Sequence, residues 1–465
     1  MESFWSDDYM SLMHTDKVVE LLLSDGRPSQ ALATILGFSL IESPQQAWIL
    51  RASALIAMIC LFLSISAQIE RSRRGSIGKF AVAIAFCLPS FQMYIHWAQL
   101  WSLLWAALAS LLALKFWSSR GLARKLLGVL LLVFALTDYP PVALFYLSVI
   151  VIVNVVNVSK TSKILEDSIQ GFLLLIVSGA FSIVAVSLSL RLSQVNPTER
   201  VRLIDASEIL DKVVWLVTRP ITVGLRPFMI DSPAPWFAVV SALPAIAVIL
   251  FGIKAQVRFL NESNFQRLIL IACLLVSTLL PVIVSPENQI EFRIIPGYCW
   301  GVTTLVLYFS LIRIDQWVTE SKLKPQQKTA LFLVPPVALM LVSILTVNLR
   351  YFELFNNSYQ VKNHFLNSKI SLCSKANQIE SITIILPKQK FPSLKRLGVY
   401  SMSTDLYSNW VTEPNVELLL QKRGIDSPIK YLENRQATIN LTTTNCLIDL
   451  EEFRQLLLEG PTRYQ

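Results

Sequence analysis

The sequence predicts an α-helical multi-pass membrane protein with a small α/β domain at its C-terminal end. Of its 465 residues, 53% are hydrophobic and only 16% are charged, whereas an average soluble chain has roughly 25% charged residues. Long uncharged segments recur from Trp48 onward, and charged residues become frequent again after residue 350. We therefore expect three regions: an outer-face segment (1–47), a transmembrane body (48–349) and an extracytoplasmic α/β domain (350–465).

The outer-face segment begins with an acidic pair, Asp7 and Asp8, and continues into two short helices. Pro28 suits the first position of the second helix. Apolar residues follow it at helical spacing and form one stripe, namely Leu32, Ile35, Leu36 and Leu40. A helix of this kind lies in the membrane interface rather than across the bilayer.

The transmembrane body contains ten apolar segments, and a bilayer core needs about 20 residues of helix. The segments are 48–68, 79–95, 98–117, 126–137, 140–158, 169–190, 235–253, 268–285, 295–312 and 329–348. No repeat of fixed period relates them, which disfavours repeat architectures.

The basic residues predict the orientation of these segments. The chain has a formal net charge of +9, and Lys and Arg collect in every second connection, as they do in cytoplasmic loops. The clusters are Arg71 to Lys79, Arg120 to Lys125, Lys160 and Lys163, Lys254 to Arg267, and Arg313 to Lys328. The basic balance is thus a topology signal, and we expect no nucleic-acid partner.

The remaining connections are then expected to face outward, together with residues 1–47 and 350–465. No basic n-region or apolar h-region of a signal peptide precedes the acidic pair. We therefore expect a further transmembrane helix upstream of Met1.

The C-terminal region combines a helical stretch near 353–379 with strand-like runs at 382–386, 398–400 and 437–441. Cys373 and Cys446 are its only cysteines. Because this region is expected in an oxidising compartment, where disulfides persist, we predict a bridge between them. The other cysteines fall in or beside apolar segments and behave as small hydrophobic residues.

The run Asp7-Asp8-Tyr9, followed by Gly26-Arg27-Pro28, resembles the bacteriophage-type glucosyl transferase II family, membrane glycosyltransferases of the GT-C superfold that modify O-antigen. The layout of residues 1 to about 350 is also similar to that family, although its members have a transmembrane helix before the acidic pair. The resemblance implies a GT-C-like fold in the bacterial inner membrane, with the active site and C-terminus on the periplasmic face.

The resemblance also implies a reaction. A sugar, glucose or another hexose, is transferred with inversion from a polyprenyl-phosphate donor to a hydroxyl of a glycan or lipid-linked glycan acceptor, among membrane lipids. Inversion needs a carboxylate that takes the acceptor proton, and the match to the motif gives this role to Asp8, then Asp7. Alternatively, Asp7 and Asp8 bind Mg²⁺ or Mn²⁺, which prefer hard oxygen ligands, or they cap a helix.

The phosphate group of the sugar donor needs a cationic partner, and arginine suits it because it binds phosphate through two parallel hydrogen bonds. Arg293, just before an apolar segment, and Arg27 are the candidates. Arg293 could instead reach lipid headgroups, and Arg27 could pair with Asp7 or Asp25.

Aromatic and polar residues in the outer segments are candidates for sugar binding: Tyr9, His96, Trp97, Asp138 and Tyr139. Trp and Tyr also populate the membrane interface for other reasons. Two rival functions are considered. A transporter would place ionisable residues within its spans, whereas here they lie at span ends; a polysaccharide polymerase or ligase would share the lipid-linked donor and the outer arginines.

Overall fold

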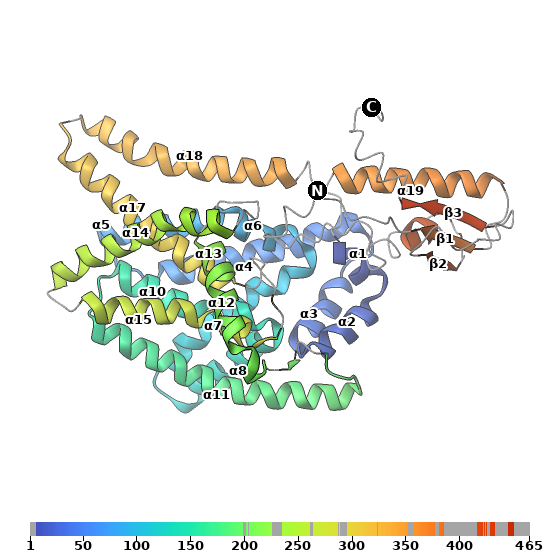
Figure 1. The fold of residues 1–465 in the computed structure, drawn as a ribbon, viewed down its shortest axis with the longest axis horizontal. Helices are drawn as coiled ribbons and strands as arrows, with labels where there is room; N and C mark the ends of the chain where they lie inside the picture. Colours follow the sequence, from blue (N-terminus) through green and yellow to red (C-terminus); the bar gives the residue numbers. More distant parts are fainter. Residues whose placement is uncertain are drawn as a thin grey trace.

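The computed structural model describes residues 6–198, 201–202, 204–225, 235–260, 264–286, 288, 295–322, 324–351, 357–376, 381–385, 416–421, 423, 425, 428–432 and 445–450. This part of the chain is mostly helical and carries one small sheet. In Figure 1, α11 and α18 run along opposite edges of the helical body, and the sheet lies beyond α1 to α3 at one end.

The helices follow one another closely. The first are α1 (Ser6–Met13), α2 (Thr15–Ser24), α3 (Pro28–Phe38) and η1 (Pro44–Ala47). The next are α4 (Trp48–Ser66), α5 (Arg73–Cys87), α6 (Pro89–His96), η2 (Ala98–Leu100), α7 (Trp101–Trp117), α8 (Leu122–Asp138), α9 (Pro140–Ala143), α10 (Phe145–Val156) and α11 (Thr161–Ser193). Then come η4 (Ala206–Glu208), α12 (Ile209–Leu216), the π-helix η5 (Val217–Ile221), α13 (Thr222–Gly224), α14 (Pro235–Leu260), α15 (Asn264–Ser277), α16 (Leu280–Val284), α17 (Pro296–Glu320) and α18 (Pro325–Tyr351).

Five helical segments of the described chain are long and apolar enough to cross a membrane: Pro44–Ser66, Ala98–Trp117, Thr161–Ser193, Pro296–Glu320 and Pro325–Leu345. Shorter apolar helices occupy Pro140–Val156, Ala242–Gln256 and Phe265–Ser277. All ten segments predicted from the sequence contain helix. Several are shorter or more broken than one continuous span.

Proline accounts for the clearest of these breaks. The segment predicted over 79–95 is two helices, because Leu88 adopts an extended conformation (φ −72°, ψ 152°) and Pro89 begins α6. The residue before a proline is biased away from helical angles, and proline is tolerated in a first helical turn. The prediction of one continuous helix here was therefore wrong.

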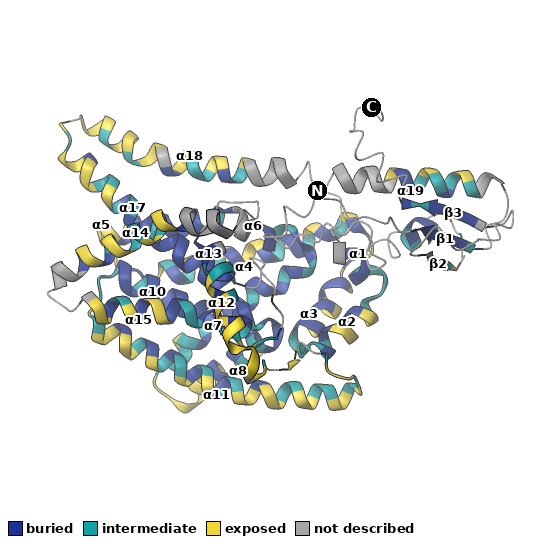
Figure 2. Cartoon of the chain, in the orientation of Figure 1, coloured by how far each residue is buried: buried dark blue, intermediate teal, exposed yellow. Residues whose placement is uncertain are grey.

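Burial divides the helices into two groups. In the most apolar stretch of α17, 72% of the residues are buried. In the corresponding stretches of α11 and α18, only 11% and 12% are buried. Figure 2 shows exposed residues along the outer sides of α11 and α18. Helices that stay apolar on an exposed face are typical of contact with lipid or with a partner surface.

The C-terminal region forms α19 (Asn357–Ala376) and a parallel three-stranded sheet in the order β2-β1-β3. Strand β1 (Ser381–Ile385) lies where the sequence predicts a strand, but β2 (Ile429–Leu432) and β3 (Asn445–Asp449) do not. The other predicted strands, 398–400 and 437–441, lie outside the described residues. A disulfide joins Cys373 of α19 to Cys446 of β3, with the two Cα atoms 5.5 Å apart.

Candidate functional site

The candidate site lies where α1, the α2–α3 turn, the end of α6 and the end of α8 approach the start of α7. Asp8 on α1 is fully buried. Its Oδ1 accepts a hydrogen bond from the backbone N–H of Gln99 at 2.8 Å. Gln99 belongs to η2, which leads directly into α7, so the Asp8 carboxylate lies at a helix N-terminus that favours negative charge.

Asp7 and Tyr9 share α1 with Asp8, but their side chains lie outside the described part of the structure. Arg293 also lies outside the described residues. The roles predicted for these three residues stay predictions.

Arg27 is positioned by the tight turn between α2 and α3. Gly26 adopts a left-handed conformation (φ 72°), which glycine accepts without steric cost. The backbone N–H of Arg27 then donates a hydrogen bond to the carbonyl of Leu22 at 2.8 Å. Pro28 then begins α3. The Gly-Arg-Pro run thus presents Arg27 at the first turn of a helix.

The Arg27 guanidinium lies over the ring of Tyr139, 4.8 Å from its centroid. Its positive charge also favours the ionised form of the neighbouring Asp138. Asp25, one of the two acids considered as its partner, instead accepts a hydrogen bond from the Thr198 hydroxyl at 2.7 Å. Arg27 therefore contacts the end of α8.

Asp138 ends α8 and is fully buried. The Ser102 hydroxyl donates to its Oδ2 at 3.4 Å, and its Oδ1 has no hydrogen-bond partner. Burial raises the pKa of Asp138 to about 7, although Ser102 and the charge of Arg27 oppose this. A carboxyl group with this pKa can take up a proton near neutral pH.

Both carboxylates accept hydrogen bonds from residues at the N-terminal end of α7. Asp8 binds the N–H of Gln99 and Asp138 binds the hydroxyl of Ser102, and these partners lie three residues apart, about one helical turn. Both side chains are fully buried, but Asp8 accepts a backbone hydrogen bond at a helix terminus, whereas Asp138 Oδ1 has no hydrogen-bond partner. Pairs of acids in contrasting environments are suited to different roles.

His96 and Trp97 lie beside this pair, immediately before η2. Burial and the nearby charge of Arg51 lower the pKa of His96 to about 4, so its ring is neutral at neutral pH. The side chain of Trp97 is buried, and this burial disfavours a role as an exposed sugar-stacking platform.

Arg51 of α4 is a site residue that the sequence analysis did not single out. It is only 8% exposed, and its Nε donates to the backbone carbonyl of His96 at 2.9 Å. The signal was an arginine near the start of an apolar segment, which marks a functional or bracing position in a membrane-type helix.

An open groove of about 690 Å³ runs beside the site between α3, α8 and α11. Its walls are mostly apolar, and Leu32, Leu130 and Leu192 are 55%, 65% and 76% exposed. At its polar end, the hydroxyls of Ser29 and Thr137 are 2.6 Å apart. These two residues are close in sequence to Arg27 and Asp138, so the groove ends at the candidate site.

Within the described residues, no group of three or more His, Cys, Asp and Glu side chains is arranged to hold a metal ion. Comparison with known proteins gives no family either: no protein-family model, no curated protein and no solved structure matches this chain.

Proposed function

We propose that this chain is a multi-pass membrane glycosyltransferase, similar to the bacteriophage-type glucosyl transferase II family, that transfers a hexose from a polyprenyl-phosphate donor to a hydroxyl of a surface glycan. In this proposal, the candidate site faces the periplasm. The observation that carries it is an exposed apolar groove whose lining residues Pro28 and Thr137 directly adjoin Arg27 and the buried Asp138 in sequence. This combination suits a substrate with a long apolar chain, a phosphate and a sugar.

The groove supports the choice of a lipid-linked donor. Its walls come from α3, α8 and α11, and their exposed leucines would contact a polyprenyl chain. The phosphate would then lie near Arg27, whose guanidinium supplies a fork of donors suited to phosphate oxygens. The Tyr139 ring below the guanidinium holds it through a cation–π contact.

The reaction is a single displacement. The acceptor hydroxyl oxygen attacks the anomeric carbon and loses its proton to a carboxylate, while the bond from that carbon to the phosphate oxygen breaks. Polyprenyl phosphate leaves with the bonding electron pair, and Arg27 stabilises its charge. The products are the glycosylated acceptor and free polyprenyl phosphate.

The contrast between the two acids favours Asp138 as the proton acceptor, in place of Asp8. The backbone donor at the start of α7 stabilises the charged form of Asp8. Asp138 has an unpartnered Oδ1 and a pKa near neutrality. The Asp8 carboxylate would then stabilise the positive charge that develops on the sugar.

Both carboxylates are buried as the structure stands. Entry of the acceptor therefore requires α1 to move away from η2, and the Asp8 to Gln99 hydrogen bond would open in that step. Movements of this kind gate many enzymes.

The test compares surface glycan from cells that carry the wild-type gene, Asp138→Asn or Asp8→Asn. We expect loss of the added hexose in Asp138→Asn, with transfer from a purified polyprenyl-phosphate donor reduced by about 10²-fold or more. Asp16→Asn is the matched control, because Asp16 is an exposed acid on neighbouring α2. Unchanged modification in both site variants would defeat the proposal, and a change in glycan chain length would indicate a polymerase.

A further inference from the structure

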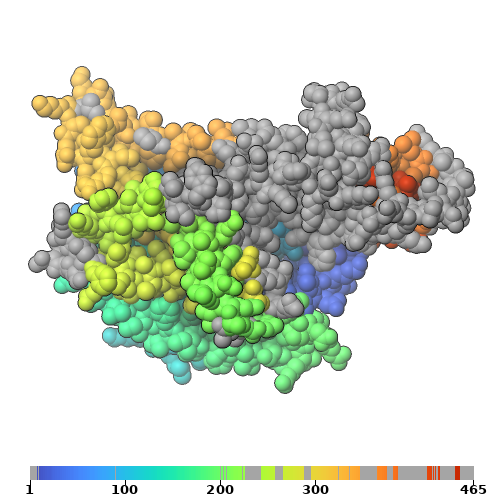
Figure 3. Space-filling model, in the orientation of Figure 1, coloured from blue at the N-terminus to red at the C-terminus, as the bar shows by residue number. Residues whose placement is uncertain are grey.

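Helix α12 has a row of apolar side chains on an exposed side. It lies in the long connection between α11 and α14, which the sequence predicts to face outward. The exposed apolar residues of α12 and the first residue of η5 recur at the spacing of one helix side. Each is at least 50% exposed, and together they form the apolar stripe: Ile209, Leu210, Val213, Val214 and Val217. Figure 3 shows α12, in bright green, on the surface of the molecule.

The lysine of the same helix is turned toward the protein. Lys212 is only 4% exposed. Its Nζ donates to Oδ1 of Asn288 at 3.0 Å and lies 4.4 Å from the centroid of the Trp215 ring. A helix on a soluble surface has the opposite arrangement, with apolar residues packed inside and charged residues in water. The arrangement of α12 therefore suits an apolar medium outside the protein.

The acidic residues at the start of α12 define another side of the helix. Glu208 and Asp211 are exposed, and at about 3.6 residues per turn they lie away from the apolar stripe. Lys212 and Leu216, one turn apart, are buried on the remaining side. One side of α12 is thus apolar, one acidic and one packed on the protein. This pattern is typical of a helix that lies in the plane of a membrane interface.

The contacts of α12 place it toward the outer ends of the helices. It packs against α16, the short helix that follows α15, and the Ile204 N–H donates to the carbonyl of Val284 in α16 at 2.9 Å. Helix α15 begins in the basic cluster from Lys254 to Arg267, which predicts a cytoplasmic loop, so α16 lies toward the outer face. In Figure 1, α12 crosses the direction of α11 and α15, as a helix in the membrane plane would.

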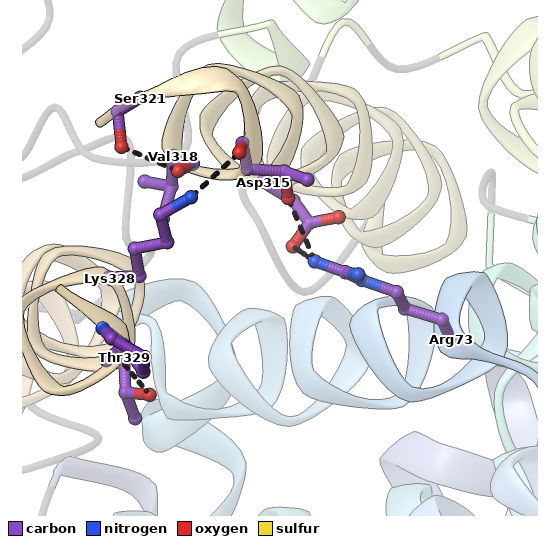
Figure 4. Close-up of polar contacts among 8 residues, drawn as sticks. Arg73, Asp315, Val318, Ser321, Lys328 and Thr329 are labelled. Atoms are coloured by element: carbon purple, nitrogen blue, oxygen red, sulfur yellow. Dashed lines mark hydrogen bonds and ion pairs between the residues drawn. The ribbon is translucent and has the colours of Figure 1, made fainter. Parts of the chain in front are cut away.

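The predicted cytoplasmic end of the body is basic and is joined by its own contacts. Arg73 Nη2 of α5 pairs with Asp315 Oδ1 of α17 at 2.7 Å, and Lys328 Nζ of α18 donates to the carbonyl of Thr319 at 2.8 Å. Figure 4 shows Arg73 and Lys328 reaching α17 from the neighbouring helices. In Figure 1, the starts of α15 and α18 lie at the same end of the body. The predicted membrane therefore lies between this basic end and α16.

The apolar stripe continues onto a predicted span. Helix η5 packs against α14, and α14 has exposed apolar side chains at Leu243, Leu250 and Phe251. Because α14 contains one of the segments predicted to cross the bilayer, these side chains are expected to contact acyl chains. Lipid that covers α14 would extend to α12, and this continuity favours lipid over a protein partner at the stripe.

We infer that α12 is an interfacial helix that binds the lipid surface of the outer leaflet. The apolar stripe lies among the acyl chains, Glu208 and Asp211 face water, and Lys212 stays packed against the protein. The leaflet would then hold the connection between α11 and α14 at a fixed depth. The inference rests on the membrane placement proposed above but not on the transfer reaction.

The first test replaces Leu210 or, as the matched control, Asp211 with the photo-crosslinking amino acid p-benzoylphenylalanine. The full chain is irradiated in vesicles of phosphatidylethanolamine and phosphatidylglycerol, and mass spectrometry counts phospholipid adducts. We expect the adduct yield at Leu210 to exceed that at Asp211 by about tenfold or more, because only the apolar stripe meets acyl chains. Equal yields would overturn the inference. So would an adduct at Leu210 that joins two protein chains, because a protein partner would then cover the stripe.

The second measurement uses a smaller side chain, which keeps the test decisive if the bulky crosslinker disturbs α12. Leu210→Cys and Asp211→Cys are alkylated in spheroplasts with a membrane-impermeant maleimide, and the wild type gives the background from the native cysteines. Asp211→Cys should react about tenfold faster or more, because alkylation needs a thiolate in water.

Two alkylation results would contradict the interfacial placement. Equal rates for Leu210→Cys and Asp211→Cys would place the apolar stripe in water. An Asp211→Cys thiol that reacts only after the membrane is opened would place α12 on the cytoplasmic side. Neither measurement depends on sugar transfer, so failure of the interfacial placement and failure of the transferase proposal can be told apart.

Discussion

Asp8 and Gln99, 91 residues apart in sequence, are joined by a 2.8 Å hydrogen bond from the Gln99 backbone N–H to the Asp8 carboxylate. This bond ties α1 to η2 and so to the start of α7. The buried carboxylate satisfies a donor that has no partner within the helix. Asp8 therefore has a structural role at the site in addition to any role in chemistry.

The two roles of Asp8 can be separated with two substitutions. Asn retains a side-chain oxygen that accepts from Gln99 but removes the charge, whereas Ala removes both. We expect Asp8→Ala to lower the free energy of unfolding by about 1–2 kcal/mol and Asp8→Asn to change it much less. Transfer should fall at least tenfold in both, which corresponds to about 1.4 kcal/mol in the barrier.

Thermal unfolding in detergent and donor-dependent transfer check this prediction. Asp8→Asn that unfolds normally and transfers sugar at the wild-type rate would restrict Asp8 to the structural role.

Asp138 predicts a pH dependence of stability. Burial raises its pKa from 3.8 to about 7 in the folded chain, so the folded state binds more protons than the unfolded state between these values. The contribution of Asp138 is fully present below pH 3.8 and is lost as the pH rises through 7. From about pH 5.5 to about pH 8.5, wild type should lose roughly 2 kcal/mol more stability than Asp138→Asn.

Transfer has the opposite dependence, because the base must be deprotonated, and it should increase as the pH rises through 7. Unfolding temperatures of the two proteins across this range provide the measurement. Parallel pH profiles for wild type and Asp138→Asn would show that Asp138 does not titrate there.

Much of the fold could be predicted because apolar segments and turn residues are local signals. The positions of α4, α7 and α17 follow from their hydrophobic composition, and the Gly26 to Pro28 turn follows from residue chemistry. The β2 and β3 strands were missed because short strands of a parallel sheet take their pairing from tertiary contacts rather than from a local pattern.

The site was predictable only in part, for the same reason. The alternation of basic and other connections assigns Asp8, Arg27 and Asp138 to one side of the membrane. In the structure, the contacts of all three residues lie near the end of α8 and the start of α7. The contrast between Asp8 and Asp138 depends on a backbone donor from η2 and on an unpartnered Asp138 oxygen, and neither is visible in the sequence. The groove likewise requires the packing of α3, α8 and α11.

The groove predicts how a substitution on α8 changes donor selection. Leu130 lines the groove and is 65% exposed, so Leu130→Trp should narrow it with little effect on folding. We expect the KM for a long-chain polyprenyl-phosphate sugar to increase about tenfold, which corresponds to about 1.4 kcal/mol of lost binding. The KM for a short-chain analogue should change little.

Leu126→Trp is the matched control, since Leu126 is 53% exposed and lies one turn earlier on α8, and Leu126 does not line the groove. Equal effects of the two substitutions, or equal effects on long and short donors, would argue against the groove as the lipid site.

The disulfide between Cys373 and Cys446 predicts both the compartment and the stability of the C-terminal domain. The bridge closes a loop with a sequence separation of 73, and the chain-entropy model gives roughly 4 kcal/mol for a loop of this length. Cys446→Ser should therefore make the α19 and sheet region much more sensitive to limited proteolysis, whereas Cys273→Ser, at an exposed free cysteine, should not.

Peptide mapping without reductant should recover Cys373 and Cys446 in one cross-linked species, because an extracytoplasmic domain meets oxidising conditions. Alkylation of both thiols in unreduced protein from intact cells would contradict the bridge and, with it, the proposed outward placement of residues 350–465.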